Sequence, residues 1–399
     1  MTDTFGPRIT GSQALDNAID WVVATATSEG FTAYTEDVTA PFFERNTETL
    51  TMISPRTANM KLIGLGSTVP TPEEGITADV LVAEGKIVVY DVPFTTYGET
   101  VQYRSHGAVE AARVGGVAAL VRSVTTFSID SPHTGAQSYS DDVPKIPSAC
   151  ITIEDTTLMH RLQDRGITVT LHLFLGAVNH ENGTLTRNTI FEIEGSQSPE
   201  EIVVVSGHLD SWDVGVGAMD DAGGCFVSWM ALRAAQKLEL KPRRTYRSLF
   251  FTAEEEGIYG GDAYFVAHGT HKGDFQLMME SDFGTFKPIG IEFSGTDEAT
   301  CMMKEIVSLT TLLGTTELYS PADTSDLNAF GAVGVPRGSL NSESDRYFWF
   351  HHSNGDRIEV YNSTHLDQVA ALWTAVSYVT ADVSFRLPQP TVVDALKNL

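Results

Sequence analysis

The stretch EIVVVSGHLDSWDVGVGAMDDAGG, residues 201–224, indicates the fold of this chain of 399 residues. Its beginning, EIVVVSG, is an apolar and β-branched run that is typical of a buried strand. His208 and Asp210 follow where this strand ends, and the pair Asp220-Asp221 precedes a helix expected over residues 222–238. A strand, a polar loop and a helix in this order form the repeating unit of an α/β sheet.

Two further apolar runs are followed by polar side chains in the same way. RSLFFTA, residues 247–253, leads into Glu254 and Glu255, and FQLMME, residues 275–280, leads into Asp282. In open α/β sheets, ligands bind just beyond the carboxyl ends of the strands. Three strands in succession are each followed by residue types that bind metals. Polar residues that only faced solvent would not be expected to show this pattern three times. The sequence therefore predicts a metal site at this edge of the sheet.

The alternation of strands and helices continues from about residue 187 to the C-terminal region. Further strands are expected at TIFEIEG and GIEFSG, and further helices over residues 261–268, 297–313 and 365–381. An N-terminal helix that Ser12 can cap is also predicted. This pattern predicts a doubly wound α/β sheet that is covered by helices on both faces.

The first half of the chain has a different texture. LGSTVPTPEEG, residues 65–75, is rich in Gly, Pro and Thr and is typical of a crossing between domains. Short β-rich runs such as KIVVYDV and VAALVRSV follow it. We therefore expect residues 1–60 to be the N-terminal part of the main domain, residues 61–186 an inserted β-rich domain, and residues 187–399 the rest of the main domain.

The charge balance excludes several partners. The chain has 26 Lys and Arg against 52 Asp and Glu, a net charge of -26, and such a surface repels phosphate backbones and anionic membranes. We therefore expect neither nucleic acid nor a membrane as a partner. The start of the sequence has no signal-peptide pattern, so we expect a cytoplasmic protein or one whose leader was removed. Cys150, Cys225 and Cys301 are too dispersed to favour a thiolate zinc site or a disulfide framework.

Two pairs of neighbouring residues leave alternatives open. One of Asp220 and Asp221 can cap the following helix while the other reaches the sheet edge, where a carboxylate can bridge two cations roughly 3.5–4 Å apart. Late in the chain, His351 and His352 point in opposite directions if the segment is extended, so we expect at most one of them to bind a metal. A further nitrogen donor beside carboxylates suits zinc.

Three consecutive acids, Glu254-Glu255-Glu256, usually form a solvated turn, but here they follow an apolar strand and precede glycines where the backbone can turn tightly. Because adjacent side chains diverge, one glutamate can bind metal while its neighbour faces water beside the metal. A carboxylate in that second position is the general base that metal-assisted hydrolysis requires.

These segments resemble a known family. SGHLDSWDVGVGAMDDAGG, FFTAEEEG, MESDFGTF and FHHSNGD, in this order, are similar to the motifs of the co-catalytic zinc peptidases of the M28 type, and the likeness extends over nearly the whole chain. The resemblance implies a mixed sheet with helices on both faces, an inserted domain like a protease-associated domain, and two zinc ions per chain. It also implies the following roles: zinc ligands His208, Asp220 (bridging both ions), Glu255, Asp282 and His352, catalytic base Glu254, and Asp210 as the residue that holds the His208 ring.

The implied reaction is hydrolysis of an amide bond in a short peptide, in particular a dipeptide with free termini. The resemblance further implies a homodimer, a secreted or lysosomal location, and a glycoprotein, for which Asn182 and Asn362 are in acceptor triplets. The rivals are an aminopeptidase acting on longer peptides, a non-catalytic receptor-like module of the same fold, and a single-zinc acyl transferase such as a glutaminyl cyclase. For recognition of the substrate carboxylate, the sequence offers only Asp326 and Arg346 as candidates.

Overall fold

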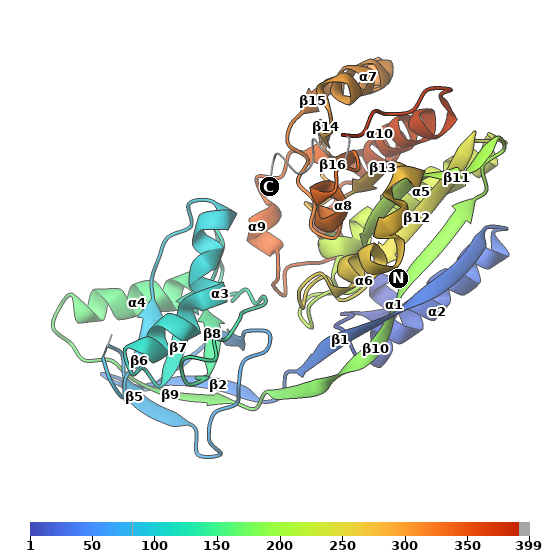
Figure 1. Cartoon of the computed structure of the whole chain (residues 1–399). Helices are drawn as coiled ribbons and strands as arrows, with labels where there is room; N and C mark the ends of the chain where they lie inside the picture. Colours follow the sequence, from blue (N-terminus) through green and yellow to red (C-terminus); the bar gives the residue numbers. More distant parts are fainter. Residues whose placement is uncertain (82, 391–399) are drawn as a thin grey trace.

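The computed structural model describes residues 1–81 and 83–390 and shows two parts that are joined by a pair of long strands (Figure 1). These strands, β1 (Thr32–Glu44) and β10 (Val178–Ile193), pair antiparallel along most of their length. The chain between them forms the smaller part, and the chain before and after them forms the larger part. The larger part therefore contains both the N-terminal region and the second half of the sequence.

The larger part is built on one eight-stranded sheet with the order β1-β10-β12-β11-β13-β16-β14-β15. The neighbours in β12-β11-β13-β16 run parallel, whereas β10 pairs antiparallel with β12, and β14 pairs antiparallel with β16. The sheet is therefore mixed, as the family resemblance implied. Its remaining strands are β11 (Ser198–His208), β12 (Arg244–Phe251), β13 (Phe275–Glu280), β14 (Pro288–Ser294), β15 (Glu317–Tyr319) and β16 (Arg337–Ser342).

Helices cover both faces of this sheet, as the alternation in the sequence predicted. Successive side chains of a strand point to opposite faces, so Val203 and Val205 of β11 pack in the core under α2, α5, α7 and α10, and Val204 packs in the core under α6 and α8. Ser12 caps the first of these helices by accepting the Leu15 N–H. The helices are α2 (Gln13–Ser28), α5 (Gly223–Lys237), α7 (Asp297–Ser308), α10 (Ser363–Asp382), α6 (Tyr259–His268) and α8 (Asn328–Ala332).

The smaller part contains two four-stranded sheets, β3-β2-β9-β5 and β4-β8-β7-β6, with a hydrophobic core of its own. Strands β2 and β3 precede residue 61 and pair in the first of these sheets, so the strands of the smaller part begin at Glu48 rather than near residue 61. Its elements are β2 (Glu48–Ser54), β3 (Ala58–Met60), β4 (Leu62–Gly64), β5 (Ile76–Asp79), β6 (Ile87–Tyr90), α3 (Tyr97–Arg113), β7 (Ala118–Arg122), β8 (Ser148–Ile151), α4 (Ile153–Gln163) and β9 (Thr170–Leu175).

Short elements complete the larger part. They are α1 (Thr2–Phe5), a helical turn at Ala218–Ala222, 3₁₀ turns at Gly269–Asp274, Leu309–Leu313 and Ile358–Val360, and α9 (Tyr347–Phe350). The three cysteines are free. Within the described ranges, no helix combines the length and the apolar character that a membrane span requires.

Candidate active site

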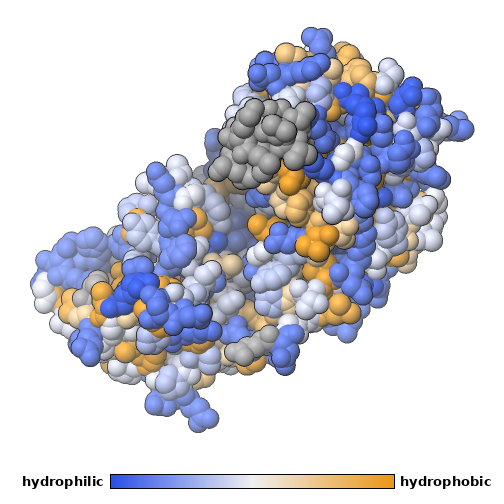
Figure 2. All heavy atoms as spheres, in the orientation of Figure 1, coloured by the Kyte–Doolittle hydropathy of each residue, from blue (hydrophilic) through white to orange (hydrophobic). Residues whose placement is uncertain are grey.

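A cavity of about 530 Å³ lies where the two parts of the molecule meet. Figure 2 shows the surface hollowed between them. Most of the lining follows the carboxyl ends of β11, β12 and β13 or comes from the loops before α8 and around α9, and α3 of the smaller part closes one side. The polar residues that line it are Tyr97, Arg104, Asp220, Glu254, Glu255, Asp282, Asp323, Thr324, Ser325, Asn328, Tyr347, His351 and His352.

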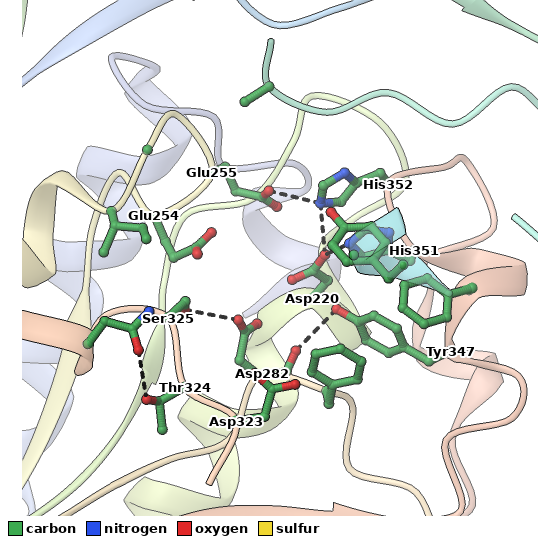
Figure 3. Close-up of a pocket in the computed structure, with 18 of the residues that line it drawn as sticks. Asp220, Glu254, Glu255, Asp282, Asp323, Thr324, Ser325, Tyr347, His351 and His352 are labelled. Carbon is green, nitrogen blue, oxygen red and sulfur yellow. Dashed lines mark hydrogen bonds and ion pairs between the residues drawn. The ribbon is translucent and has the colours of Figure 1, made fainter. Parts of the chain in front are cut away.

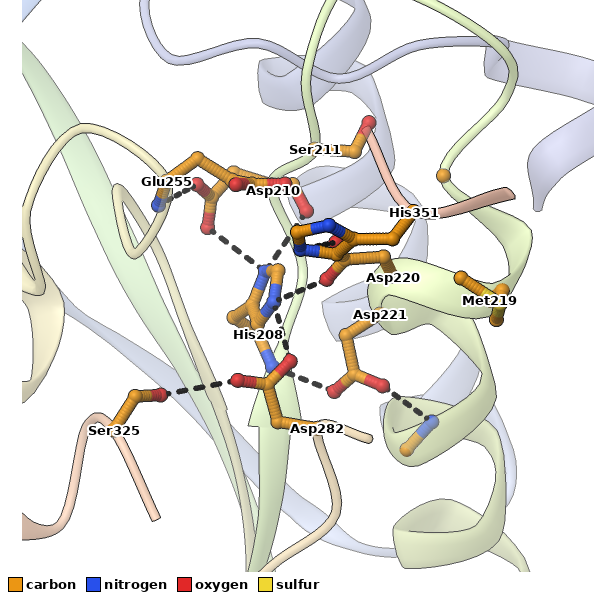
Figure 4. Close-up of polar contacts among 12 residues, drawn as sticks. His208, Asp210, Ser211, Met219, Asp220, Asp221, Glu255, Asp282, Ser325 and His351 are labelled. Atoms are coloured by element: carbon orange, nitrogen blue, oxygen red, sulfur yellow. Dashed lines mark hydrogen bonds and ion pairs between the residues drawn. The ribbon is translucent and has the colours of Figure 1, made fainter. Parts of the chain in front are cut away.

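One group of metal-binding side chains surrounds His208 (Figure 4). The Nε2 atom of His208 lies 3.2 Å from Asp220 Oδ1 and 3.0 Å from Asp282 Oδ1. His208 ends β11, Asp282 follows β13, and Asp220 lies in the segment before α5. The parallel arrangement of β11 and β13 brings His208 and Asp282 to the same edge of the sheet.

A second group surrounds His352 (Figure 3). Its Nε2 atom lies 3.0 Å from Glu255 Oε2 and 3.3 Å from Asp220 Oδ2. The two oxygens of Asp220 therefore face different histidines, each of which has a further carboxylate beside it. The five residues that the family resemblance implied as zinc ligands converge on one place.

The spacing of these donors fits zinc. Zinc–nitrogen and zinc–oxygen bonds of about 2.0–2.1 Å place the donors of a tetrahedral site about 3.3 Å apart, and the donor pairs above lie 3.0–3.3 Å apart. The buried Asp220 Oδ2 has no hydrogen-bond partner, as expected of an atom that binds a cation. Imidazole and carboxylate together form a donor set that zinc prefers.

The expectation for His351 and His352 was wrong in one respect. Both rings lie on the same side and stack with centroids 3.5 Å apart, because His352 has a positive φ of 58° and the segment is not extended. His351 Nε2 also approaches Asp220 Oδ2, at 3.5 Å. Only His352 has Glu255 beside it as well, which favours His352 as the ligand.

Main-chain oxygens orient both histidine rings. His208 Nδ1 lies 3.1 Å from the carbonyl oxygen of Asp210, and His352 Nδ1 lies 3.1 Å from that of Thr134. Each Nδ1–H then donates to a carbonyl, which leaves Nε2 with a lone pair for a metal. The Asp210 carboxylate, which we expected to hold His208, lies 3.7 Å from the ring and accepts the Glu255 N–H.

The sequence left open which of Asp220 and Asp221 caps the following helix and which reaches the sheet edge, and the structure separates the two roles. Asp221 accepts the N–H groups of Gly224 and His208 and so caps the start of α5, whereas Asp220 faces the two histidines. Asp356, whose role was not predicted, accepts the N–H groups of Ala218, Met219 and Asp220. Its position inside FHHSNGD was the signal that could have revealed this support for the metal-binding loop.

The three consecutive glutamates point in three directions. Glu255 faces His352, Glu254 faces the cavity (Figure 3), and Glu256 accepts a hydrogen bond from Thr10. Burial raises the pKa of Glu254 well above its usual range, and the charge of His208 only partly opposes this. A carboxylate with a raised pKa beside a metal site is suited to accept and return a proton.

Burial also dominates the electrostatics of the ligands. It would raise the pKa of Asp220, but the imidazoles of His208 and His352, which face its two oxygens, hold this pKa well below its usual range in the metal-free protein. The pKa of Glu255 is raised by burial to about 7. Asp220 is therefore ionised over the whole physiological range, as a carboxylate that binds cations must be.

A second set of polar residues, Glu280 and Ser325, lies behind Asp282, and the sequence patterns did not predict it. Glu280, at the end of β13, is fully buried and accepts hydrogen bonds from the side chain and main chain of Ser325. The Ser325 hydroxyl also lies 3.2 Å from Asp282 Oδ2, so its single proton can be donated to either carboxyl but not to both at once. Burial raises the pKa of Glu280 to about 7. This buried carboxyl positions the loop that orients Asp282.

Neither sequence candidate for carboxylate recognition lines the cavity. Asp326 is buried behind it and accepts the Gly261 N–H, and Arg346 is exposed on the surface. Three residues that line the cavity were not predicted from the sequence. Tyr97 and Arg104 reach it from α3. The third is Tyr347, whose hydroxyl donates to the main-chain oxygen of Asp282 at 3.1 Å. An α/β sheet, a strand-edge cluster of imidazoles and carboxylates, and a glutamate beside it together indicate a metal-dependent hydrolase.

Comparisons with known proteins agree with this class. Residues 188–377 match the family model of Peptidase family M28. The chain is 46% identical to carboxypeptidase Q of Mus musculus over 98% of its own length and 86% of that protein. A crystal structure of a peptidase M28 precursor from Shewanella amazonensis SB2B superposes with a TM-score of 0.93 at 31% identity, covering 98% of this chain and 93% of the other. The chain therefore belongs to peptidase family M28.

A zinc aminopeptidase from Bacillus subtilis shares the fold, with a TM-score of 0.70 at 18% identity over 98% of this chain and 94% of that structure. Membership of the family makes this chain a metallopeptidase, a hydrolase of peptide bonds. The predicted class of enzyme is thus confirmed.

Proposed function

We propose that this chain is a di-zinc peptidase that hydrolyses short peptides, in particular dipeptides with free termini. The observation that carries the proposal is that each oxygen of Asp220 faces its own histidine–carboxylate pair, His208 with Asp282 and His352 with Glu255. A bridging carboxylate between two such pairs is the arrangement of two-metal hydrolases. The likeness to carboxypeptidase Q supports action at a free carboxyl terminus.

The residues of the chain divide the reaction among them. When bound, zinc supplies Lewis acidity that polarises the scissile carbonyl and makes water acidic near neutral pH. Glu254 takes a proton from the attacking water, whose oxygen bonds to the carbonyl carbon. The same carboxyl then gives that proton to the amide nitrogen as the carbon–nitrogen bond breaks. The products are a carboxylic acid and a free amine.

The rivals differ from this proposal in measurable ways. A single-zinc acyl transferase would bind one metal per chain, and a receptor-like module would bind substrates without turnover. An aminopeptidase would cleave peptides whose carboxyl terminus is blocked. The cavity between the two parts and the buried imidazoles and carboxylates beside it favour a peptidase over a receptor-like module.

Several further properties follow from the family resemblance and are part of the proposal. We propose that the smaller part, whose strands run from β2 (Glu48–Ser54) to β9 (Thr170–Leu175), is an inserted domain related to protease-associated domains. The sequence predicted this domain over residues 61–186, between segments 1–60 and 187–399 of the catalytic domain. We also propose that the protein is a homodimer with a secreted or lysosomal location. Asn182 and Asn362 are exposed, as glycosylation would require.

The first test replaces the proposed base. We expect Glu254→Gln to retain its zinc and to lose turnover by at least ~100-fold, the usual contribution of general acid–base catalysis. Metal analysis and steady-state kinetics on the zinc-loaded protein measure the two effects. Full turnover in this variant would remove Glu254 from the mechanism.

The second test addresses the substrate. A panel of dipeptides with free, amino-blocked and carboxyl-blocked ends should show cleavage of the free dipeptides, and a chelator should abolish it. Metal analysis should give two zinc ions per chain. Cleavage of amino-blocked peptides alone would contradict the dipeptidase proposal.

A further inference from the structure

Different parts of the molecule hold the two histidines of the proposed metal centre. His208 ends β11, which pairs with β12 on one side and with β13 on the other. Its Nδ1 lies 3.1 Å from the Asp210 carbonyl oxygen, its main-chain N–H donates to Asp221, and its main-chain oxygen lies 3.2 Å from Cys225 Sγ. All these partners belong to the larger part, so the sheet and its loops fix the position of His208.

His352 is held from the smaller part. The Thr134 N–H donates to the His352 carbonyl at 2.9 Å, and the Thr134 carbonyl oxygen lies 3.1 Å from His352 Nδ1. The carbonyl of His351 accepts a hydrogen bond from Nδ1 of the buried His133. His133 and Thr134 therefore orient both the main chain of this segment and the ring whose Nε2 faces the metal-binding carboxylates.

The helix that precedes these histidines also packs against the smaller part. Figure 1 shows α9 between the two parts of the molecule. The ring of Phe348 contacts those of Phe94 and Tyr97, with centroids 5.2 and 5.0 Å apart, and Trp349 contacts Phe127 at 5.1 Å. These are the distances of aromatic rings in contact, so the position of α9 depends on the smaller part.

The loop that contains Thr134 is anchored to both parts. Within the smaller part, the Thr134 hydroxyl donates to the Gly64 carbonyl at 2.9 Å. The Arg45 guanidinium donates to the two carboxylate oxygens of Asp213, at 2.8 and 3.0 Å, and to the Thr134 hydroxyl oxygen at 3.2 Å. Asp213 follows β11 of the larger part, and a two-point arginine–carboxylate pair fixes orientation as well as distance. Arg45 therefore sets where the loop meets His352.

We propose that contact with the smaller part completes only one of the two metal positions, an inference that rests on the proposed di-zinc function. The position of His208 and Asp282 is built by the larger part by itself. The position of His352 and Glu255 is complete only while the loop around Thr134 holds the histidine. Outer contacts that orient a ligand typically contribute about 10- to 100-fold to metal affinity, so the two zinc ions differ in their dependence on this loop.

The coupling acts in both directions. If contact with the smaller part strengthens zinc binding at His352, zinc at His352 strengthens that contact by the same factor. A molecule whose parts have separated would therefore keep the ion at His208 and release the ion at His352. Arg45 and His133 are positioning residues in this scheme, since they act on the metal position through the segment that carries His352.

The test removes two contacts of the loop at once. Arg45→Met/His133→Phe loses the ion pair to Asp213 and the donor to the His351 carbonyl. Zinc binding is measured by competition with a chromophoric chelator. We expect the affinity for one ion to fall about 10- to 100-fold and the affinity for the other to change by less than about threefold.

Three further variants serve as controls. Arg122→Met/His172→Phe removes an arginine and a histidine whose partners lie within the smaller part, and it should bind both ions as the unaltered protein does. Arg45→Met/His133→Asn should recover part of the loss, because the asparagine amide N–H can replace the Nδ1–H donor. If the double variant does not fold, His133→Phe alone repeats the test with a smaller expected loss at the same ion.

Single-site proteins assign the effect to one position. In His208→Ala only the position of His352 remains, and adding Arg45→Met/His133→Phe should weaken its zinc. In His352→Ala only the position of His208 remains, and the same addition should leave its zinc unchanged. Equal weakening in both backgrounds, or no weakening in either, would overturn the proposal.

Hydrogen exchange separates failure of this proposal from failure of the proposed function. Zinc should slow exchange of the Thr134 amide, which donates to the His352 carbonyl, and should not do so in His352→Ala. If the unaltered protein binds a single zinc ion, the di-zinc function fails. The contact between the smaller part and His352 is then still supported if exchange at Thr134 slows, and it is refuted if zinc leaves that exchange unchanged.

Discussion

The two parts of this molecule contribute different things to one cavity. The larger part provides every carboxylate and imidazole of the proposed metal centre, from loops that follow parallel strands of its sheet. The smaller part provides Tyr97, Arg104 and the Thr134 carbonyl, from a helix and a loop that lie against His352. The carboxylates and imidazoles of the cavity thus come from the edge of the sheet, whereas its guanidinium comes from a second unit placed over that edge.

The two parts differ in how their structure positions side chains at the cavity. Neighbouring parallel strands end at the same edge, so short loops bring acids and histidines from distant segments into contact. The smaller part has its own core and is joined to the larger part by the β1–β10 ribbon. Substitutions or pH changes that affect one part and leave the other unchanged test whether the two parts act separately.

The largest effect is expected when the bridging carboxylate is removed. Asp220→Ala should lose most of its bound zinc and all measurable turnover, because both donor groups lose an oxygen. Metal analysis after dialysis measures the first effect. The control is Asp262→Ala, which alters an exposed carboxylate on α6. Two tightly bound zinc ions in Asp220→Ala would remove the bridging role.

A smaller effect should distinguish the two cores. Leu249 lies in the larger part and Leu171 in the smaller part, and both are fully buried. Each Leu→Ala change should lower the free energy of unfolding by about 2–5 kcal/mol. Because the cores are separate, we expect calorimetry to show two transitions, with each variant shifting one of them. Equal shifts of both transitions would show that the parts unfold as one unit.

The smallest effect concerns the metal-free protein. We expect the stability of the two parts to change in opposite directions with pH. Burial raises the pKa of Glu255 and Glu280 in the larger part to about 7. Between about pH 4.5 and 7 the folded state therefore retains protons that the unfolded state releases, so the larger part loses stability as the pH rises. Zinc should reverse this trend, because binding requires deprotonated ligands.

In the smaller part, burial lowers the pKa of His133 to about 4 from its usual 6.5. The folded state holds this ring neutral, so its contribution to stability is present above pH 6.5 and is lost as the pH falls towards 4. Calorimetry of the chelated protein between pH 5 and pH 8 should therefore move the two transitions in opposite directions. Parallel movement of both would contradict the assignment of these groups to separate parts.

Much of the larger part could be predicted from local patterns. Apolar β-branched runs alternate with amphipathic segments, and the polar residues that end each run lie at the edge where parallel strands meet. His208, Glu254 and Asp282 were found in this way, since each lies at or just beyond the carboxyl end of a strand. His351 and His352 follow no strand in the predicted pattern, and the family resemblance was needed to choose His352 of the two.

The sequence by itself determined the class of fold, the kind of chemistry and the polar residues at the strand ends, because periodicity and strand ends are local properties. Only the tertiary structure decided which atoms meet. The positive φ of His352 turns its ring towards Asp220, Asp356 holds the loop of Asp220, and α3 brings Arg104 to the cavity from a part of the chain more than a hundred residues away. Such contacts depend on how separate elements pack against one another, and no local pattern records that packing.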